Sequence, residues 1–216
     1  YPSNPTGREY PKDVLEGLAK VITKHHLYAV ADEIYSDLVY GVKHYSLATM
    51  IPERTLFISG LSKSHAMTGY RLGYIAGPAQ IMSSIRKMHA YLVTTVTDNV
   101  QAAATEALNN GREDPIAFRK TYEHRRDLVA DGLRKLGFEM STPQGAFYIF
   151  AKIPDRFGKD DVAFAKRLAK EAKVGVTPGS AFGAGGEGYV RLSYASSDED
   201  LQECLRRIGE FVKKLN

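Results

Sequence analysis

Thr55-Leu-Phe-Ile-Ser59 is a short apolar run that is typical of a buried strand, and a similar run, Tyr28-Ala-Val-Ala31, lies upstream. A third run, Arg71-Leu-Gly-Tyr-Ile-Ala-Gly77, follows downstream. Apolar residues recur at helical spacing over residues 11–24, before the first run, and from Pro78 onward, after the third. This alternation of strands and helices predicts an α/β fold, in which helices cover a layered sheet.

A turn-rich segment, Asn109-Asn-Gly-Arg-Glu-Asp-Pro115, interrupts the apolar periodicity and is predicted to be a domain hinge. The pattern beyond it predicts a compact α+β unit. Its helices are expected over residues 120–136, 160–172 and 198–214, and its strands over residues 146–151, 174–176 and 189–194. We therefore predict two domains, residues 1–115 and residues 116–216.

The composition is that of an ordinary globular chain of 216 residues, with 44% hydrophobic and 25% charged residues. The net charge is +4, but the basic residues form no stripe, so we expect no nucleic acid as partner. No apolar stretch approaches the roughly 20 residues that span a bilayer, so we expect no membrane as partner. A single cysteine, Cys204, fits a reducing cytoplasmic setting, and the six histidines show no metal-ligand spacing. Because the chain lacks an initiating Met, we expect it to be processed or part of something longer.

Two acids and a phenol, in Asp32-Glu-Ile-Tyr35, follow the first predicted strand at its carboxyl end. Open α/β sheets bind ligands outside the carboxyl ends of their strands, so this cluster is well placed for a site. The alternative is that Asp32 caps the next helix, which is a common role for an aspartate after a strand.

Lys63 comes shortly after the second predicted strand and is flanked by Gly60 and small hydroxyl residues. In a partly desolvated site the pKa of a lysine ammonium falls, and the neutral amine becomes nucleophilic. Arg71 follows in the same segment and can offer its planar guanidinium to a phosphate. The alternative for both residues is that they are ordinary solvated cations on the surface.

Five motifs occur along the chain in a fixed order. They are Asn4-Pro-Thr-Gly7, Asp32-Glu-Ile-Tyr35, Ser62-Lys63 with Gly69-Tyr-Arg71-Leu-Gly-Tyr74, Pro178-Gly-Ser-Ala-Phe-Gly183 and Tyr189-Val-Arg191-Leu-Ser-Tyr194. In this order they resemble the class I (fold type I) aminotransferases, which depend on pyridoxal 5'-phosphate (PLP). The resemblance is to the gamma subgroup, and within it to bacterial aromatic-amino-acid and PatA-like aminotransferases. It implies a C-terminal fragment: the C-terminal part of the PLP-binding large domain, with a mixed, mostly parallel sheet, joined to a small α+β domain.

The resemblance also implies roles for the residues that match the motifs. Lys63 would form the internal aldimine with PLP and later move a proton between the substrate α-carbon and the cofactor. Asp32 would pair with the pyridine nitrogen and keep it protonated. Asn4 and Tyr35 would hydrogen-bond the 3'-oxygen of the ring. The catalytic residues implied are thus Lys63, Asp32 and Tyr35.

Three further residues would hold anionic groups, according to the same resemblance. Arg71 would anchor the cofactor phosphate, and Ser62 would add a hydroxyl contact to the cofactor. Arg191 would clamp the α-carboxylate of the substrate, an interaction that suits a bidentate guanidinium.

The activity implied is a ping-pong transfer of the amino group of an L-amino acid to a 2-oxo acid, catalysed by a cytoplasmic homodimer. The stretch Tyr91–Gln101 contains no arginine for a second substrate carboxylate, which favours aromatic amino acids or a broad substrate range. N-acetylated diaminopimelate stays open as a substrate through the PatA-like resemblance. Two other classes also stay open: a PLP-dependent β-C–S lyase and a PLP-sensing domain of a transcription regulator.

Members of the family begin upstream of the Asn4 motif, so the resemblance implies that early strands and part of the cofactor cage are absent from this chain. The large-domain sheet is then expected to have an uncovered edge and uncovered apolar faces. We also expect the isolated chain to bind PLP poorly and to have little activity.

Overall fold

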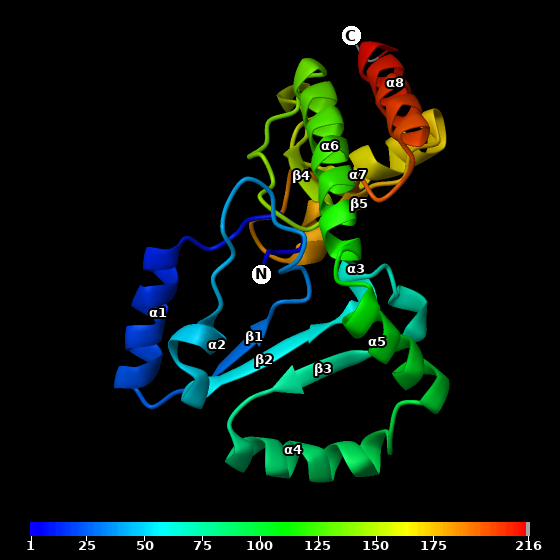
Figure 1. The fold of residues 1–216 in the computed structure, drawn as a ribbon. Coiled ribbons are helices and arrows are strands. Elements are labelled where there is room, and N and C mark those ends of the chain that lie inside the picture. Colours follow the sequence, from blue (N-terminus) through cyan, green and yellow to red (C-terminus); the bar gives the residue numbers. More distant parts are fainter. Residues whose placement is uncertain (215–216) are drawn as a thin grey trace. The chain divides into compact units, whose positions relative to one another are not determined.

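Residues 1–214 are described by the computed structural model, and the chain divides into two units, whose elements Figure 1 traces. Unit 1 consists of Tyr1–Pro2 and Glu9–Arg119, and unit 2 of Ser3–Arg8 and Lys120–Asn216. A long helix, α6 (Asp114–Lys135), contributes residues to both units. The boundary between residues 115 and 116 stays a prediction about the domains of the complete protein.

The predicted strands of unit 1 form one sheet of order β1-β2-β3, with β1 (Ala29–Asp32), β2 (Thr55–Gly60) and β3 (Gly73–Ala76). β1 and β2 are parallel, with Asp32 opposite Ile58, so their carboxyl ends lie at the same edge. β2 and β3 are antiparallel. The sheet is therefore mixed, and the ends of β1 and β2 are neighbours in space.

The helices predicted in unit 1 are confirmed as α1 (Lys12–Lys24) and α4 (Ala79–Leu92). In α1, Leu15 and Ala19 are buried four residues apart and belong to a small apolar cluster with Leu47 and Ile51. No residue of α4 is buried, so the apolar stripe that predicts this helix stays uncovered in the described residues. The periodicity does not predict the short or weakly apolar elements α2 (Leu47–Met50), α3 (Leu61–Ser64), α5 (Asp98–Asn110) and the 3-10 helices Pro52–Arg54 and Thr68–Tyr70.

Unit 2 contains an antiparallel sheet of order β4-β6-β5, formed by β4 (Tyr148–Lys152), β6 (Tyr189–Ser193) and β5 (Thr177–Pro178). Ile149 and Val190 are 0% exposed on one face, whereas Phe150 and Arg191, which are register partners, are half-buried on the other. The buried face carries an extensive apolar core, to which α6, α7 (Asp161–Arg167) and α8 (Asp198–Lys214) contribute.

The strand predicted at residues 174–176 is wrong, because β5 begins only at Thr177. Val174 is buried in the core, and its N–H bonds to the Leu168 carbonyl of the π-helical turn Leu168–Ala172. The apolar side chain of Val174 thus packs at the end of a helix, and its apolar character reflects this packing rather than strand pairing.

The predicted helices of unit 2 are confirmed, although α6 begins earlier than predicted. α8 spans the predicted residues, and Ser197 Oγ accepts a hydrogen bond from the Asp200 N–H at 3.1 Å, as an N-cap does. α6 begins at Asp114, inside the turn-rich segment, so only residues 111–113 separate α5 from α6. The 3-10 helices Asp155–Phe157 and Gly179–Phe182 complete the unit.

Candidate active site

The carboxyl ends of β1 and β2 carry the first group of predicted site residues. Asp32 is the last residue of β1, and α3, with Ser62 and Lys63, begins directly after Gly60 ends β2. Because β1 and β2 are parallel neighbours, these residues lie at one edge of the sheet. This is the edge at which open α/β sheets bind ligands.

Lys63 and Tyr35 lie beside each other at this edge. The Nζ atom of Lys63 is 5.7 Å from the centroid of the Tyr35 ring, within the range of a cation–π contact. Tyr35 is 7% exposed, and Lys63 is half-buried. The amine is therefore held against the phenol ring rather than extended into solvent.

Asp32 is exposed, and its Oδ1 atom accepts a hydrogen bond from the Ile34 N–H at 3.2 Å. Residues 34–37 form a turn, so the alternative in which Asp32 caps a helix is wrong. The bond instead orients the carboxylate at the start of the turn that carries Tyr35.

Gly60 is required by the close approach of two strands where α3 begins. A Cβ atom at this position would lie 2.9 Å from the Leu72 carbonyl oxygen and 3.0 Å from Cα of Gly73. Any larger residue would push β2 and β3 apart, since the nearest atoms belong to the backbone. Glycine thus fixes the start of the segment that carries Lys63.

Two hydrogen bonds from side chains to backbone carbonyls stabilise the conformation of the segment from Ser62 to Arg71. Thr68 Oγ1 donates to the Ser62 carbonyl at 2.9 Å, and Nη1 of Arg71 donates to the Thr68 carbonyl at 3.0 Å. Arg71 has a left-handed backbone, with φ of 56°, and an exposed side chain. One short segment therefore presents the hydroxyl of Ser62, the amine of Lys63 and the guanidinium of Arg71.

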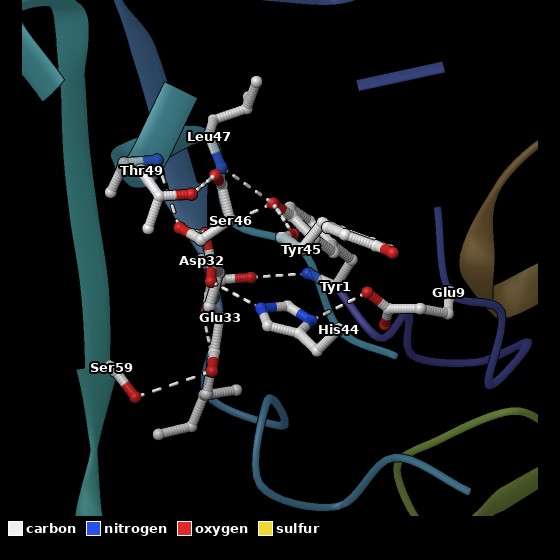
Figure 2. A network of polar contacts seen from close by, with 12 residues as sticks. Tyr1, Glu9, Asp32, Glu33, His44, Tyr45, Ser46, Leu47, Thr49 and Ser59 are labelled. Atoms are coloured by element: carbon white, nitrogen blue, oxygen red, sulfur yellow. Dashed lines mark hydrogen bonds and ion pairs between the residues drawn. The ribbon is translucent and has the colours of Figure 1, made fainter. Parts of the chain in front are cut away.

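A buried polar bridge that the sequence pattern does not predict lies beside Asp32 (Figure 2). The Nε2 atom of His44 is 2.7 Å from Oε2 of Glu33, and its Nδ1 atom is 2.7 Å from Oε1 of Glu9. Glu33 is 1% exposed and Glu9 is 6% exposed. We call these three residues the Glu9–His44–Glu33 bridge. Glu9 lies 35 residues from His44 in the sequence, so no local spacing could have indicated the contact.

Charge and burial act in opposite directions on His44. Burial lowers the pKa of the imidazole, but the hydrogen bonds and charges of Glu33 and Glu9 outweigh it and raise the pKa to about 9. Burial, followed by the charge of Glu33, also raises the pKa of the Tyr1 hydroxyl, which donates to Glu33 Oε1 at 3.2 Å. His44 is thus an imidazolium at neutral pH, and Tyr1 remains an O–H donor.

The remaining predicted residues, Asn4 and Arg191, lie together in unit 2. Nη1 of Arg191 donates to Asn4 Oδ1 at 2.8 Å, and Nη2 donates to Thr177 Oγ1 at 3.3 Å. The guanidinium carbon is 4.4 Å from the Tyr148 ring centroid and 4.9 Å from that of Phe182. Within the described residues, Nε of Arg191 is buried and has no hydrogen-bond partner. Arg191 is therefore rigidly held and keeps donor capacity for an anion.

The turn that carries Asn4 is tied to the rest of unit 2 by the backbone of Gly7. The Gly7 carbonyl accepts hydrogen bonds from the N–H groups of Gln144 at 2.8 Å and Gly145 at 3.0 Å. Gly7 has a positive φ of 65°, and a Cβ atom there would lie 2.6 Å from Cβ of Pro143. Since Asn4 belongs to unit 2 and Tyr35 to unit 1, the pairing of these two residues stays a prediction.

The family model described as aminotransferase class I and II matches residues 1–208 of the chain. The chain belongs to this aminotransferase family. Class I aminotransferases use PLP, so the chemistry of the site can be compared with that cofactor.

Curated aminotransferases match nearly the whole length of the chain. The "Probable N-acetyl-LL-diaminopimelate aminotransferase" of Bacillus subtilis is 43% identical over 99% of the chain and 54% of its own length. Aromatic-amino-acid aminotransferase 2 of Thermococcus litoralis is 42% identical over 99% of the chain and 56% of its own length. The chain thus spans about half the length of the curated aminotransferases it matches.

Solved aminotransferase structures have the same fold. The aromatic aminotransferase of Pyrococcus horikoshii matches with a TM-score of 0.94 and 40% identity, over 100% of this chain and 59% of the other. The aspartate aminotransferase of Thermus thermophilus with maleate matches with a TM-score of 0.90 and 41% identity, over 97% and 55%. These matches confirm the predicted α/β fold of the PLP aminotransferases.

The groups at the strand ends fit the chemistry of PLP. They comprise a carboxylate for a protonated ring nitrogen, a phenol, an amine for an aldehyde, and a hydroxyl with a guanidinium for a phosphate. In residues 1–214, no three His, Cys, Asp or Glu side chains gather in a way that could hold a metal ion. None of the described helices is long and apolar enough to cross a membrane.

Proposed function

We propose that the complete protein is a PLP-dependent aminotransferase that transfers the amino group of an L-amino acid to a 2-oxo acid by a ping-pong mechanism. The observation that carries this proposal is the contact of Lys63 with Tyr35, beside Asp32, at the carboxyl ends of two parallel strands. The curated relatives support it, because they are named as aminotransferases over the length that matches this chain.

Five residues of unit 1 and one of unit 2 are proposed to hold the cofactor. Asp32 would accept a hydrogen bond from the protonated pyridine nitrogen, and Tyr35 and Asn4 would hydrogen-bond the ring oxygen. Arg71 and Ser62 would bind the phosphate, and Lys63 would provide the amine for covalent attachment. When bound, PLP supplies an electron sink for the negative charge that develops at the substrate α-carbon.

Lys63 is also proposed to move the proton. As a free neutral amine, Lys63 would act as a general base and take the proton from the substrate α-carbon. The Lys63 side chain lies against the Tyr35 ring, so its amine would stay close to the groups proposed to hold the cofactor.

Arg191 is proposed to bind the α-carboxylate of both the amino acid and the 2-oxo acid. The two rings and the Asn4 side chain restrain the guanidinium, and its buried Nε–H is a donor with no partner in the described residues. A preorganised arginine loses little conformational entropy on binding a carboxylate.

The substrate range is proposed to be aromatic or broad. The stretch Tyr91–Gln101 contains no arginine for a second carboxylate. We further propose a cytoplasmic homodimer: a single cysteine suits a reducing compartment, and unit 1 exposes Tyr91 at 94% and Leu92 at 77%, which suits contact with another subunit.

The experiment uses the complete protein with PLP. Borohydride reduction followed by peptide mass spectrometry should locate the pyridoxyl group on Lys63. Phenylalanine, tyrosine, aspartate and N-acetyl-diaminopimelate, each with 2-oxoglutarate, should then be compared as amino donors by following glutamate formation. Phenylalanine or tyrosine is expected to be the best donor.

Other outcomes would redirect the proposal. Pyruvate release from a cysteine conjugate without an amino acceptor would indicate a β-C–S lyase. Trapping at Lys63 without turnover of any donor would support a PLP-sensing domain. Absence of trapping at Lys63 would contradict the proposal itself.

A further inference from the structure

Glu33 is the residue through which the Glu9–His44–Glu33 bridge reaches the candidate site. Its carboxylate accepts a hydrogen bond from Ser46 Oγ at 2.7 Å and contacts His44 and the Tyr1 hydroxyl (Figure 2). Its own N–H donates to the Ile58 carbonyl of β2 at 2.8 Å, and its carbonyl accepts from the Ser36 N–H at 3.0 Å. Both the side chain and the backbone of Glu33 are therefore held.

Asp32 and Tyr35 are placed by the same short segment. Successive residues of an extended chain point to opposite sides, and Asp32 is exposed while Glu33 is buried. Fixing the Glu33 side chain on the inner side therefore fixes the direction of Asp32 on the outer side. The bond from the Ser36 N–H to the Glu33 carbonyl then spans the turn that carries Tyr35.

The geometry of the bridge suits a cation at its centre. Two buried carboxylates without a cation between them are costly, because burial removes their hydration. An imidazole donates hydrogen bonds from both nitrogens only when it is protonated. The distances of 2.7 Å on both sides of His44 suit charge-assisted bonds of this kind.

We propose that the Glu9–His44–Glu33 bridge is a positioning device, which holds residues 32–35 in the conformation that presents Asp32 and Tyr35 to the cofactor. The inference rests on the proposed function, because Asp32 and Tyr35 acquire these roles only in a PLP site. Glu9, His44 and Glu33 are positioning residues, since they act through the backbone of this segment.

The device is sensitive to alkaline pH. The titratable groups that face His44 are Glu9, Glu33 and Tyr1, whose ring centroid is 5.2 Å from the imidazole. Deprotonation of His44, with a pKa of about 9, leaves the two buried carboxylates without their cation. The Tyr1 hydroxyl does not compensate, because its raised pKa keeps it neutral over this range.

The first test examines the bridge itself in the cofactor-free complete protein. Nitrogen NMR of ¹⁵N-histidine-labelled protein should show both nitrogens of His44 protonated at neutral pH, with loss of this signature near pH 9. Amide exchange of residues 33–38 should become about tenfold faster in His44→Gln, which removes a charged hydrogen-bond partner. His25→Gln, at an exposed histidine, is the matched control and should change neither signal.

The second test measures PLP binding by the folded protein. We expect His44→Gln to weaken PLP binding about tenfold at neutral pH and to remove the additional loss of affinity that wild type shows near pH 9. Glu9→Gln leaves Asp32, Glu33 and Tyr35 unchanged and should weaken binding in the same direction. It provides a second variant if His44→Gln does not fold.

The outcomes separate the possible failures. A lowered melting temperature with unchanged PLP affinity and pH profile would show a merely structural bridge and overturn the proposal. A neutral His44 at neutral pH would overturn it as well. If wild type fails to bind PLP at Lys63, the proposed function fails and the positioning role falls with it, even where NMR finds the bridge.

Discussion

Units 1 and 2 differ in where they place their apolar side chains. In unit 2, residues from helices and strands meet in one core, with Leu133, Ile149 and Val190 all 0% exposed. In unit 1, Leu15 and Leu38 are also 0% exposed, but fewer apolar residues are buried and the strand residue Val30 is 66% exposed. Burial of apolar side chains therefore contributes less to the stability of unit 1 than to that of unit 2.

This contrast shows that different interactions stabilise each unit internally. Unit 1 carries Lys63, Asp32 and Tyr35, and its most deeply buried contacts include a charged bridge. Unit 2 carries Arg191, which lies on the outer face of a sheet whose inner face is the apolar core. The residue proposed to bind the substrate carboxylate thus belongs to the unit with the more extensive apolar core, and most of the residues proposed to hold the cofactor belong to the unit with fewer buried apolar side chains.

The largest expected effect is a loss of activity when Lys63 of unit 1 is substituted. Lys63→Ala in the complete protein should lower transamination on the order of 10³-fold or more, because the proposed general base is lost. Circular dichroism should remain unchanged, since the lysine is half-buried and outside the apolar cluster. Lys12→Ala, at an exposed surface lysine, is the control and should retain activity. Activity retained by Lys63→Ala would remove the reason for assigning the chemistry to unit 1.

The second prediction tests the difference in cores directly, in the 216-residue chain. Leu133→Ala in unit 2 should destabilise its unit by about 2–5 kcal/mol, because a fully buried leucine leaves a cavity. Val30→Ala in unit 1 should change stability by less than about 0.5 kcal/mol, as an exposed side chain does. Hydrogen exchange, read separately for the two units, measures both values. Equal costs would contradict the contrast.

The third prediction concerns pH and unit 1. The pKa of His44 is raised from its ordinary 6.5 to about 9, so its stabilising effect is fully present below pH 6.5 and is lost as the pH rises through 9. Because the imidazole is partly screened by solvent, we expect a loss of about 2 kcal/mol across this range. The measurement is urea unfolding of unit 1 against pH. A similar slope in His44→Gln would show that another group is responsible.

The smallest effect is expected at a helix end of unit 2. Ser197→Ala removes the acceptor for the Asp200 N–H and should destabilise unit 2 by about 1 kcal/mol. Ser197→Thr keeps a hydroxyl and should lose less. Thermal unfolding of the two variants measures the difference, and an equal loss would show that the hydroxyl does not cap α8.

The fold is largely predictable where the pattern is local. The apolar runs that become β1 and β2 are followed by Asp32 and Gly60, residue types that commonly end strands. The segment that becomes α8 has both an apolar stripe and an N-cap residue. Prediction is wrong at Val174, because an apolar residue has the same signature at a helix end as in a strand. It misses α5, in which only Ala104 is buried, so little apolar periodicity marks the helix.

In the candidate site, too, some contacts are predictable from the sequence and others are not. Lys63, Asp32 and Tyr35 follow strands that are parallel neighbours, so their proximity follows once the strands are recognised. The Glu9–His44–Glu33 bridge and the contact of Asn4 with Arg191 join residues far apart in the sequence. No local spacing predicts such contacts, because they exist only after distant segments have packed together.

Local sequence alone determines which segments of this chain become strands and helices, and which of them carry an amine, a carboxylate and a guanidinium. The physical reason is that apolar periodicity and end residues act over a few neighbouring positions. Only the tertiary structure decides that His44 is charged and that Arg191 is held by two rings and an amide. Burial and the choice of partners depend on the whole fold, and they set the charge and the direction of each group.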